Sequence, residues 1–310
     1  MRTGRIPLQT FTDTCMDRAA HRALSRQGPV PPGLHHCCEE ERFVLTSIII
    51  FMVLGSFAGV LAGLLGVGGG LVIVPMINYT FAIQGITGEH THHMALGTSL
   101  ATIMFTSISS FMTHHRNKAV IWTIVKYITP GILLGTFLGS KVASHLPTNL
   151  LKGFFVVFLL YVGTQMLMNI KPKASREIPG LLGNSAAGGV IGLVSSFVGI
   201  GGGTLSVPYM TWCNVPMHKA IGTSAAIGFP IAVAGALGYV VNGMGVEGLP
   251  GPHLGFIYLP ALLGIAAASV CTAPLGAKLA HRLPVTKLKK AFACLLFVMA
   301  AQMAYSLFMS

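Results

Sequence analysis

The chain has 310 residues, of which 53% are hydrophobic and only 9% are charged, and this balance excludes an ordinary soluble globular domain. Its net charge of +12 comes from basic residues in short clusters between apolar runs, a pattern that orients membrane helices and gives no reason to expect a nucleic-acid partner. At about 20 residues per crossing, the length allows about eight to ten membrane segments.

Residues 1–42 form a polar leader that differs from the rest of the chain. They hold six Arg, five acidic residues and the Pro-rich stretch Pro29–Pro32, without an apolar run, and we expect them to be disordered. They lack the apolar core of a signal peptide, and an upstream mis-start of translation before Phe43 is one interpretation. His35–Cys38 contains metal-ligand types but lacks a second ligand pair, so we predict no metal site.

From residue 43 onward the chain is a series of long apolar segments, which must be helices because lipid offers unpaired backbone groups no hydrogen bonds. Two segments, 68–84 and 202–213, are too short or too rich in glycine for ordinary spans. We therefore predict an all-α polytopic membrane protein with about eight transmembrane helices plus Gly-rich broken or re-entrant elements. The segments are 43–65, 68–84, 95–114, 119–143, 150–170, 181–200, 202–213, 219–241, 254–280 and 288–309.

The second half of the chain repeats the first in three blocks that occur in the same order. The paired blocks are Gly66–Pro75 with Gly199–Pro208, His93–Ser99 with His218–Ser224, and Gly139–Phe155 with Gly276–Phe292. The pattern predicts a duplicated and fused unit, with a first repeat at 43–176 and a second at 177–310. Membrane transporters are commonly built from such repeats, with the substrate held where the copies meet.

Basic residues indicate how the two repeats are oriented. If each Gly-rich element is a re-entrant hairpin and the N-terminus lies outside, eleven basic residues fall on the cytoplasmic side and only Lys141 and Lys152 outside. A plain eight-span arrangement divides the same thirteen residues five to eight. The positive-inside rule therefore favours two inverted repeats with paired re-entrant elements.

The two Gly-rich turns are the first candidate for solute binding. A helix broken inside the membrane leaves N–H groups without partners at the break. The helix that restarts there directs these amides and the positive end of its dipole toward the same point. Glycine allows the turn and a close approach to a ligand, so two such turns would form a cradle for an anion. The alternative is that the small residues only allow close helix packing. The candidate residues are Gly66, Gly68, Gly69, Gly70, Gly199, Gly201, Gly202 and Gly203.

Hydroxyls and histidines near the turns are the second candidates. Hydroxyls that open the following helices could donate to an oxyanion, although they could equally bond back to a helix carbonyl. These hydroxyls belong to Thr98, Ser99, Thr223 and Ser224. His93 and His218 match in the two repeats and are candidates for proton coupling, the alternative being solvated loop histidines.

The acidic residues give no sign of catalysis. From residue 43 onward they are only Glu89, Glu177 and Glu247, which leaves no carboxylate pair within a helix. No P-loop motif is present either. We therefore predict no enzyme activity, no cofactor and no metal, and expect any active transport to use an ion gradient or a partner protein.

Several motifs together resemble the TauE/SafE sulfite exporter family, also called the toluene sulfonate uptake permease family. The motifs are Gly59–Pro75, Ser196–Pro208, the two His-x-Ala-x-Gly-Thr-Ser blocks, Leu259–Gly264 and Ala273–Pro284. The resemblance covers about residues 43–310 and implies a secondary carrier in the cytoplasmic membrane. It also implies that the solute is a small sulfur-containing anion: sulfite, sulfoacetate, thiosulfate or a related organosulfonate.

The leading hypothesis is thus a multi-pass secondary transporter of a small anion, working by alternating access between the two repeats, with exchanged or co-transported protons. One alternative is a passive anion channel that uses the same cradle as its selectivity element. Another is a membrane-embedded assembly subunit that transports nothing itself.

Overall fold

The computed structural model describes residues 32–65, 69–86, 88–168, 178–280 and 285–308. The chain divides into two units, Met1–Leu45 and Thr46–Ser310. Of the first unit, the structure describes only the beginning of helix α2. The second unit contains the remainder of α2 and every other element.

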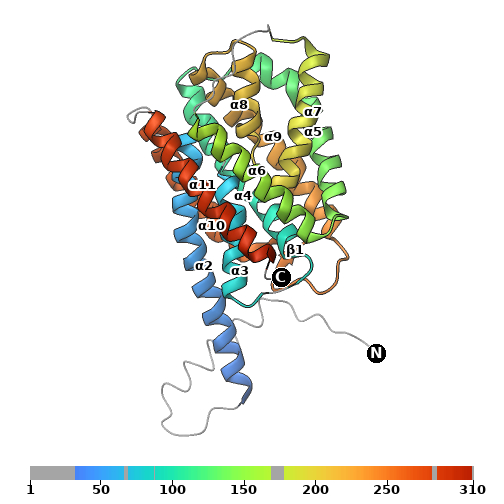
Figure 1. The fold of residues 1–310 in the computed structure, drawn as a ribbon. Coiled ribbons are helices and arrows are strands. Elements are labelled where there is room, and N and C mark those ends of the chain that lie inside the picture. The colour runs from blue at the N-terminus through green and yellow to red at the C-terminus, as the bar shows by residue number, and fades with distance from the viewer. Residues whose placement is uncertain (1–31, 66–68, 87, 169–177, 281–284, 309–310) are drawn as a thin grey trace. The chain divides into compact units, whose positions relative to one another are not determined.

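Ten helices and one short β-hairpin make up the described residues (Figure 1). The helices are α2 (Pro32–Leu65), α3 (Gly70–Ile83), α4 (Thr91–Arg116), α5 (Trp122–Ser144), α6 (Thr148–Leu167), α7 (Leu181–Val198), α8 (Gly203–Trp212), α9 (Met217–Gly243), α10 (Leu259–Ala280) and α11 (Val285–Phe308). The hairpin joins β1 (His253–Leu254) to β2 (Ile257–Tyr258), with His253 opposite Tyr258.

Seven of the described helices are long and apolar enough to cross a membrane: α2, α4, α6, α7, α9, α10 and α11. Large apolar side chains point outward from the bundle, for example Leu134, Leu182 and Val298, which are 68%, 86% and 65% exposed. Such a surface suits lipid, so the prediction of an all-helical, multi-pass membrane protein is confirmed. The Gly-rich elements α3 and α8 have 14 and 10 residues and are too short to span, as the sequence predicts.

Of the roughly eight transmembrane helices predicted, seven are found among the described helices, because the expected span 119–143 forms α5 but is not apolar enough to count among them. The bounds of the segments differ from the prediction in two places. Helix α2 begins at Pro32, before the expected boundary at residue 43, and proline is well tolerated at a first helical position because no intrahelical partner is lost there. Residues 1–31 of the predicted leader lie outside the described residues. The second difference is the β-hairpin, which occupies the start of the expected helix 254–280, where Gly251 and Gly255 turn the chain with φ of 63° and 56°.

Helices α4 and α9 are the two most buried spans, at 72% and 67%, and they run antiparallel. A Cβ built on Gly97 would lie 3.1 Å from the Cβ of Tyr239, while one built on Gly228 would lie 3.8 Å from the Cβ of Ser107. The N-terminal half of α4 therefore packs against the C-terminal half of α9, and the C-terminal half of α4 packs against the N-terminal half of α9.

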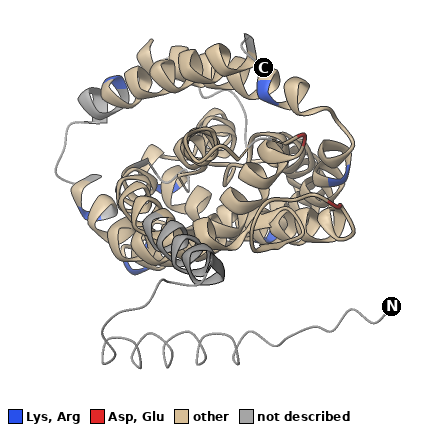
Figure 2. Ribbon diagram, turned by 90° about the horizontal axis from the view of Figure 1, so that it is seen from below, with Lys and Arg blue, Asp and Glu red and all other residues tan. Residues whose placement is uncertain are grey.

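Charged residues are sparse in the second unit, as Figure 2 shows. The described acidic residues of this unit are Glu89 and Glu247, and both lie in turns between helices. No carboxylate of the described part therefore lies within a membrane-crossing helix of the second unit, where an unpaired charge would be costly.

Candidate functional site

The two Gly-rich turns have the same backbone geometry. Gly69 precedes α3 with φ 79° and ψ −8°, and Gly202 precedes α8 with φ 72° and ψ −7°. These are left-handed conformations, which favour glycine because other residues carry a Cβ that clashes there. The carbonyl of Gly202 accepts from the N–H groups of Leu205 and Ser206 at 3.0 and 2.8 Å, so the first turn of α8 starts at this residue.

The two turns are in direct backbone contact. A Cβ built on Gly70 would overlap the carbonyl oxygen of Gly199 and lie 2.9 Å from the Cα of Ile200. Gly199 itself ends α7 in the left-handed conformation, with φ 67°. The predicted candidates at 69, 70, 199 and 201–203 are all buried, whereas Gly66 and Gly68 lie outside the described residues. Glycine at position 70 is thus required by the closeness of the second turn.

Two of the predicted hydroxyls join helices that are far apart in sequence. Thr98 Oγ1 accepts from the N–H of Tyr258 at 2.9 Å, just before α10 begins. Thr223 Oγ1 accepts from the N–H of Ile121 at 3.0 Å, just before α5 begins. The two contacts are reciprocal. Thr98 joins α4, in the first half of the chain, to the start of α10 in the second half, and Thr223 joins α9, in the second half, to the start of α5 in the first half. Burial also raises the pKa of the Tyr258 hydroxyl, which stays neutral at physiological pH.

The other two predicted hydroxyls behave differently from each other. Ser99 Oγ donates to the carbonyl of Gly199 at 2.8 Å, so α4 is bonded directly to the second Gly-rich turn. Ser224 Oγ donates to the carbonyl of Ile221 at 2.9 Å, which is the local bond back into the same helix that the sequence left open as an alternative. All four hydroxyl residues are fully buried.

The two predicted proton-coupling histidines lie in unlike surroundings. His93 is buried, and its Nε2 lies 3.1 Å from the carbonyl oxygens of both Ala143 and Leu146 at the end of α5. Because a carbonyl can only accept, Nε2 must carry the proton. Nδ1 lies 3.3 Å from Thr148 Oγ1. His218 is exposed at the beginning of α9 and shares none of this environment.

Three buried hydroxyls near the second turn were missed in the sequence. Ser195, Thr204 and Ser206 have hydroxyl oxygens with no hydrogen-bond partner among the described residues. A position-by-position comparison of the two Gly-rich blocks would have singled out Thr204 and Ser206, because the first block has Leu71 and Ile73 there.

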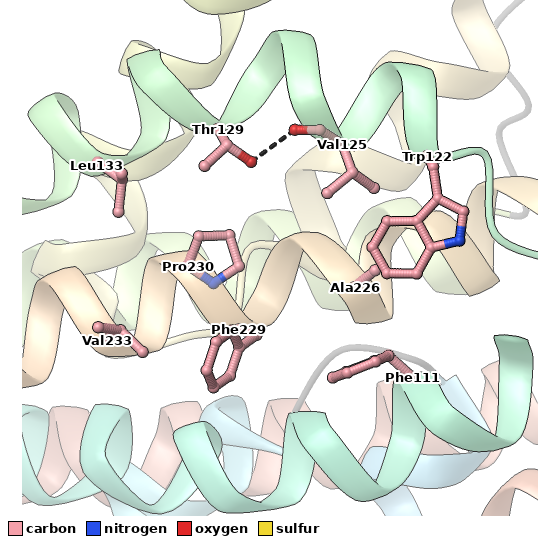
Figure 3. A pocket seen from close by; sticks show the side chains of 9 residues that line it. All are labelled: Phe111, Trp122, Val125, Thr129, Leu133, Ala226, Phe229, Pro230 and Val233. Carbon is pink, nitrogen blue, oxygen red and sulfur yellow. Dashed lines mark hydrogen bonds between the residues drawn. The ribbon is translucent and has the colours of Figure 1, made fainter.

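A separate groove of about 330 Å³ opens between α4, α5 and α9 (Figure 3). Apolar side chains dominate its lining, and the hydroxyl of Thr129 is already donated to the carbonyl of Val125. The groove therefore offers little to an anion. Its lining residues are Phe111, Trp122, Val125, Thr129, Leu133, Ala226, Phe229, Pro230 and Val233.

Comparison with known proteins identifies the family. The family described as "Sulfite exporter TauE/SafE" matches residues 51–303. The chain belongs to this family. A protein of Haemophilus influenzae described as a probable membrane transporter is 38% identical over 263 residues, covering 84% of this chain and 99% of the relative. The probable membrane transporter YunE of Bacillus subtilis is 28% identical, covering 70% and 84% of the two chains. No solved structure matches. This TauE/SafE protein is accordingly a multi-pass transmembrane transporter.

Proposed function

We propose that this TauE/SafE protein is a secondary carrier of a small anion, with sulfite, thiosulfate and organosulfonates as the substrate class, in the cytoplasmic membrane. The observation that carries the proposal is the direct backbone contact between the N-terminus of α3, at Gly70, and the second Gly-rich turn, at Gly199 and Ile200. Family membership adds the sulfur chemistry, because the family description names sulfite export.

The helix N-termini supply the binding chemistry. The first N–H groups of a helix have no preceding helical carbonyl to bond, and here these are the amides of Gly70 and Leu71 in α3 and of Gly203 and Thr204 in α8. Such amides, with the positive end of the helix dipole, favour an anion without a buried cation. Binding by neutral dipoles also leaves the anion free to depart, which a carrier requires.

The transport cycle we propose rocks one inverted repeat against the other. Two observations support the inverted arrangement. Helix α4 and its sequence counterpart α9 are antiparallel, and the contacts of Thr98 and Thr223 are reciprocal between the halves of the chain. The Gly-rich turns would then be the fixed point about which the solute is exposed to each side in turn.

Protons are the coupling ion that we propose, with His93 as the group that takes one up. Its Nε2 proton is committed to two carbonyls, so Nδ1 is the atom available for protonation.

Radiolabelled sulfite and thiosulfate flux into proteoliposomes tests the proposal, with and without an imposed pH gradient. A carrier gives saturable flux and counterflow, and proton coupling makes the flux follow the gradient. Unitary currents in a voltage-clamped bilayer would instead indicate a channel. Absence of flux for both anions and for sulfoacetate would reject the substrate class.

A further inference from the structure

The two Gly-rich turns have the same backbone geometry but differ in the side chains around them. Around the second turn stand Ser195, Thr204 and Ser206, and the residues 133 positions earlier, around the first turn, are Ala62, Leu71 and Ile73. Three hydroxyls in one copy thus correspond to three apolar side chains in the other. The N–H groups are equivalent in the two turns, so any difference in anion binding comes from these side chains.

The geometry confirms that Ser195 and Ala62 occupy corresponding places. A Cβ built on Gly202 would lie 3.5 Å from Ser195 Oγ, and a Cβ built on Gly69 would lie 3.2 Å from the Cβ of Ala62. The Ser195 hydroxyl therefore lies beside the N-terminus of α8. Thr204 and Ser206 belong to the first turns of that helix itself and, two positions apart, leave different faces of it. Ile73, the counterpart of Ser206, lies 3.5 Å from a Cβ built on Gly69, on the same side as Ala62, so Ser206 is the hydroxyl on the side of Ser195.

All three hydroxyls are buried inside the protein. Ser195 and Ser206 are 0% exposed and Thr204 is 7% exposed, and none of the three hydroxyl oxygens has a hydrogen-bond partner among the described residues. Buried polar atoms are normally paired, because an unpaired one forfeits its bonds to water. The neighbouring Ser196 of α7 is paired in the usual way, because its hydroxyl donates to the carbonyl of Leu193 at 2.7 Å.

We infer that the anion is bound by the second turn alone, through the hydroxyls of Ser195 and Ser206 and the N–H groups that begin α8. The first turn packs against it as an apolar partner. The inference rests on the proposed function and narrows it, because the ligand it fits is an oxyanion with several acceptor oxygens, such as sulfite, thiosulfate or a sulfonate group. Hydrogen bonds to a charged acceptor are stronger than those between neutral groups, so each hydroxyl should matter measurably.

The test measures binding separately from transport. Isothermal titration of the purified full-length protein with sulfite, thiosulfate and sulfoacetate gives the affinity, and proteoliposome flux gives the transport rate. The variants are Ser195→Ala and Ser206→Ala, which remove the hydroxyl and leave the Cβ in place. The control is Ser196→Ala, an adjacent buried serine whose hydroxyl has a partner in its own helix.

We expect each of the two variants to weaken anion affinity about tenfold, which corresponds to about 1.4 kcal/mol, while Ser196→Ala stays within about twofold of the unaltered protein. Size-exclusion elution checks that every variant is folded. Unaltered affinity in both variants would overturn the inference, as would an unaltered protein that binds none of the three anions. Binding that weakens as expected in a protein without flux would uphold the site and reject the carrier function instead.

Discussion

Gly70 lies where the two turns touch, and a single methyl group should separate them. We predict that Gly70→Ala lowers anion flux at least about tenfold, because its Cβ would overlap the Gly199 carbonyl, while membrane insertion is retained. Gly153→Ala in α6 is the control, since a Cβ there meets nothing within 4 Å. Flux is compared per amount of inserted protein, and equal flux in both variants would refute a functional contact between the turns.

Thr98 and Thr223 each accept a buried or half-buried N–H from the other half of the chain. Thr98→Val leaves the amide of Tyr258 without its acceptor, and we expect a loss of about 1–3 kcal/mol in stability. Thr223→Val should have a comparable effect through Ile121. Thermal unfolding in detergent measures both, and Thr129→Val is the control because its hydroxyl only bonds back within α5. A change in Tm no larger than in the control would show that the hydrogen bonds of Thr98 and Thr223 do not stabilise the fold.

At the scale of elements, glycines let α5 and α7 pack backbone to backbone. A Cβ on Gly135 would overlap the carbonyl of Gly189, and one on Gly131 would overlap that of Ser185. We predict that Gly135→Ala destabilises the protein by about 1–3 kcal/mol, since the two helices must move apart. The fraction of monodisperse protein after heating in detergent is the readout, with Gly153→Ala again as the matched helix glycine. Equal heat resistance in the two variants would show that this packing is tolerant.

At the scale of the whole molecule, inverted repeats predict which loops share a side of the membrane. The turn after α4 should be cytoplasmic and the loop after α9 external. In a protein without other cysteines, we expect Glu247→Cys to react with a membrane-impermeant maleimide in intact cells and Asn117→Cys to react only after permeabilisation. Both positions are exposed, so accessibility in the folded protein does not limit either reaction. Labelling of both from one side would exclude the inverted arrangement.

The sequence by itself determined the features that depend on local composition. The predicted segment 181–200 became α7 at Leu181–Val198, and 219–241 became α9 at Met217–Gly243, because a run of apolar residues in lipid has to pair its own backbone. Glycine at 69 and 202 also marked the turns correctly, since few other residues adopt a positive φ. The TauE/SafE membership could also be recognised from the sequence, because the motifs that carry it are short local runs of residues.

Only the tertiary structure decided how these pieces meet. Nothing local in the sequence indicates that Ser99 donates to Gly199, 100 residues away. Nor does it indicate that His93 donates to the carbonyls of Ala143 and Leu146 at the end of α5. The hydroxyls of Ser195 and Ser196 look alike in the sequence, yet Ser196 has a hydrogen-bond partner and Ser195 has none among the described residues. The physical reason is that hydropathy and turn preference belong to a residue and its neighbours, whereas the pairing of a buried polar group depends on which distant backbone packs against it.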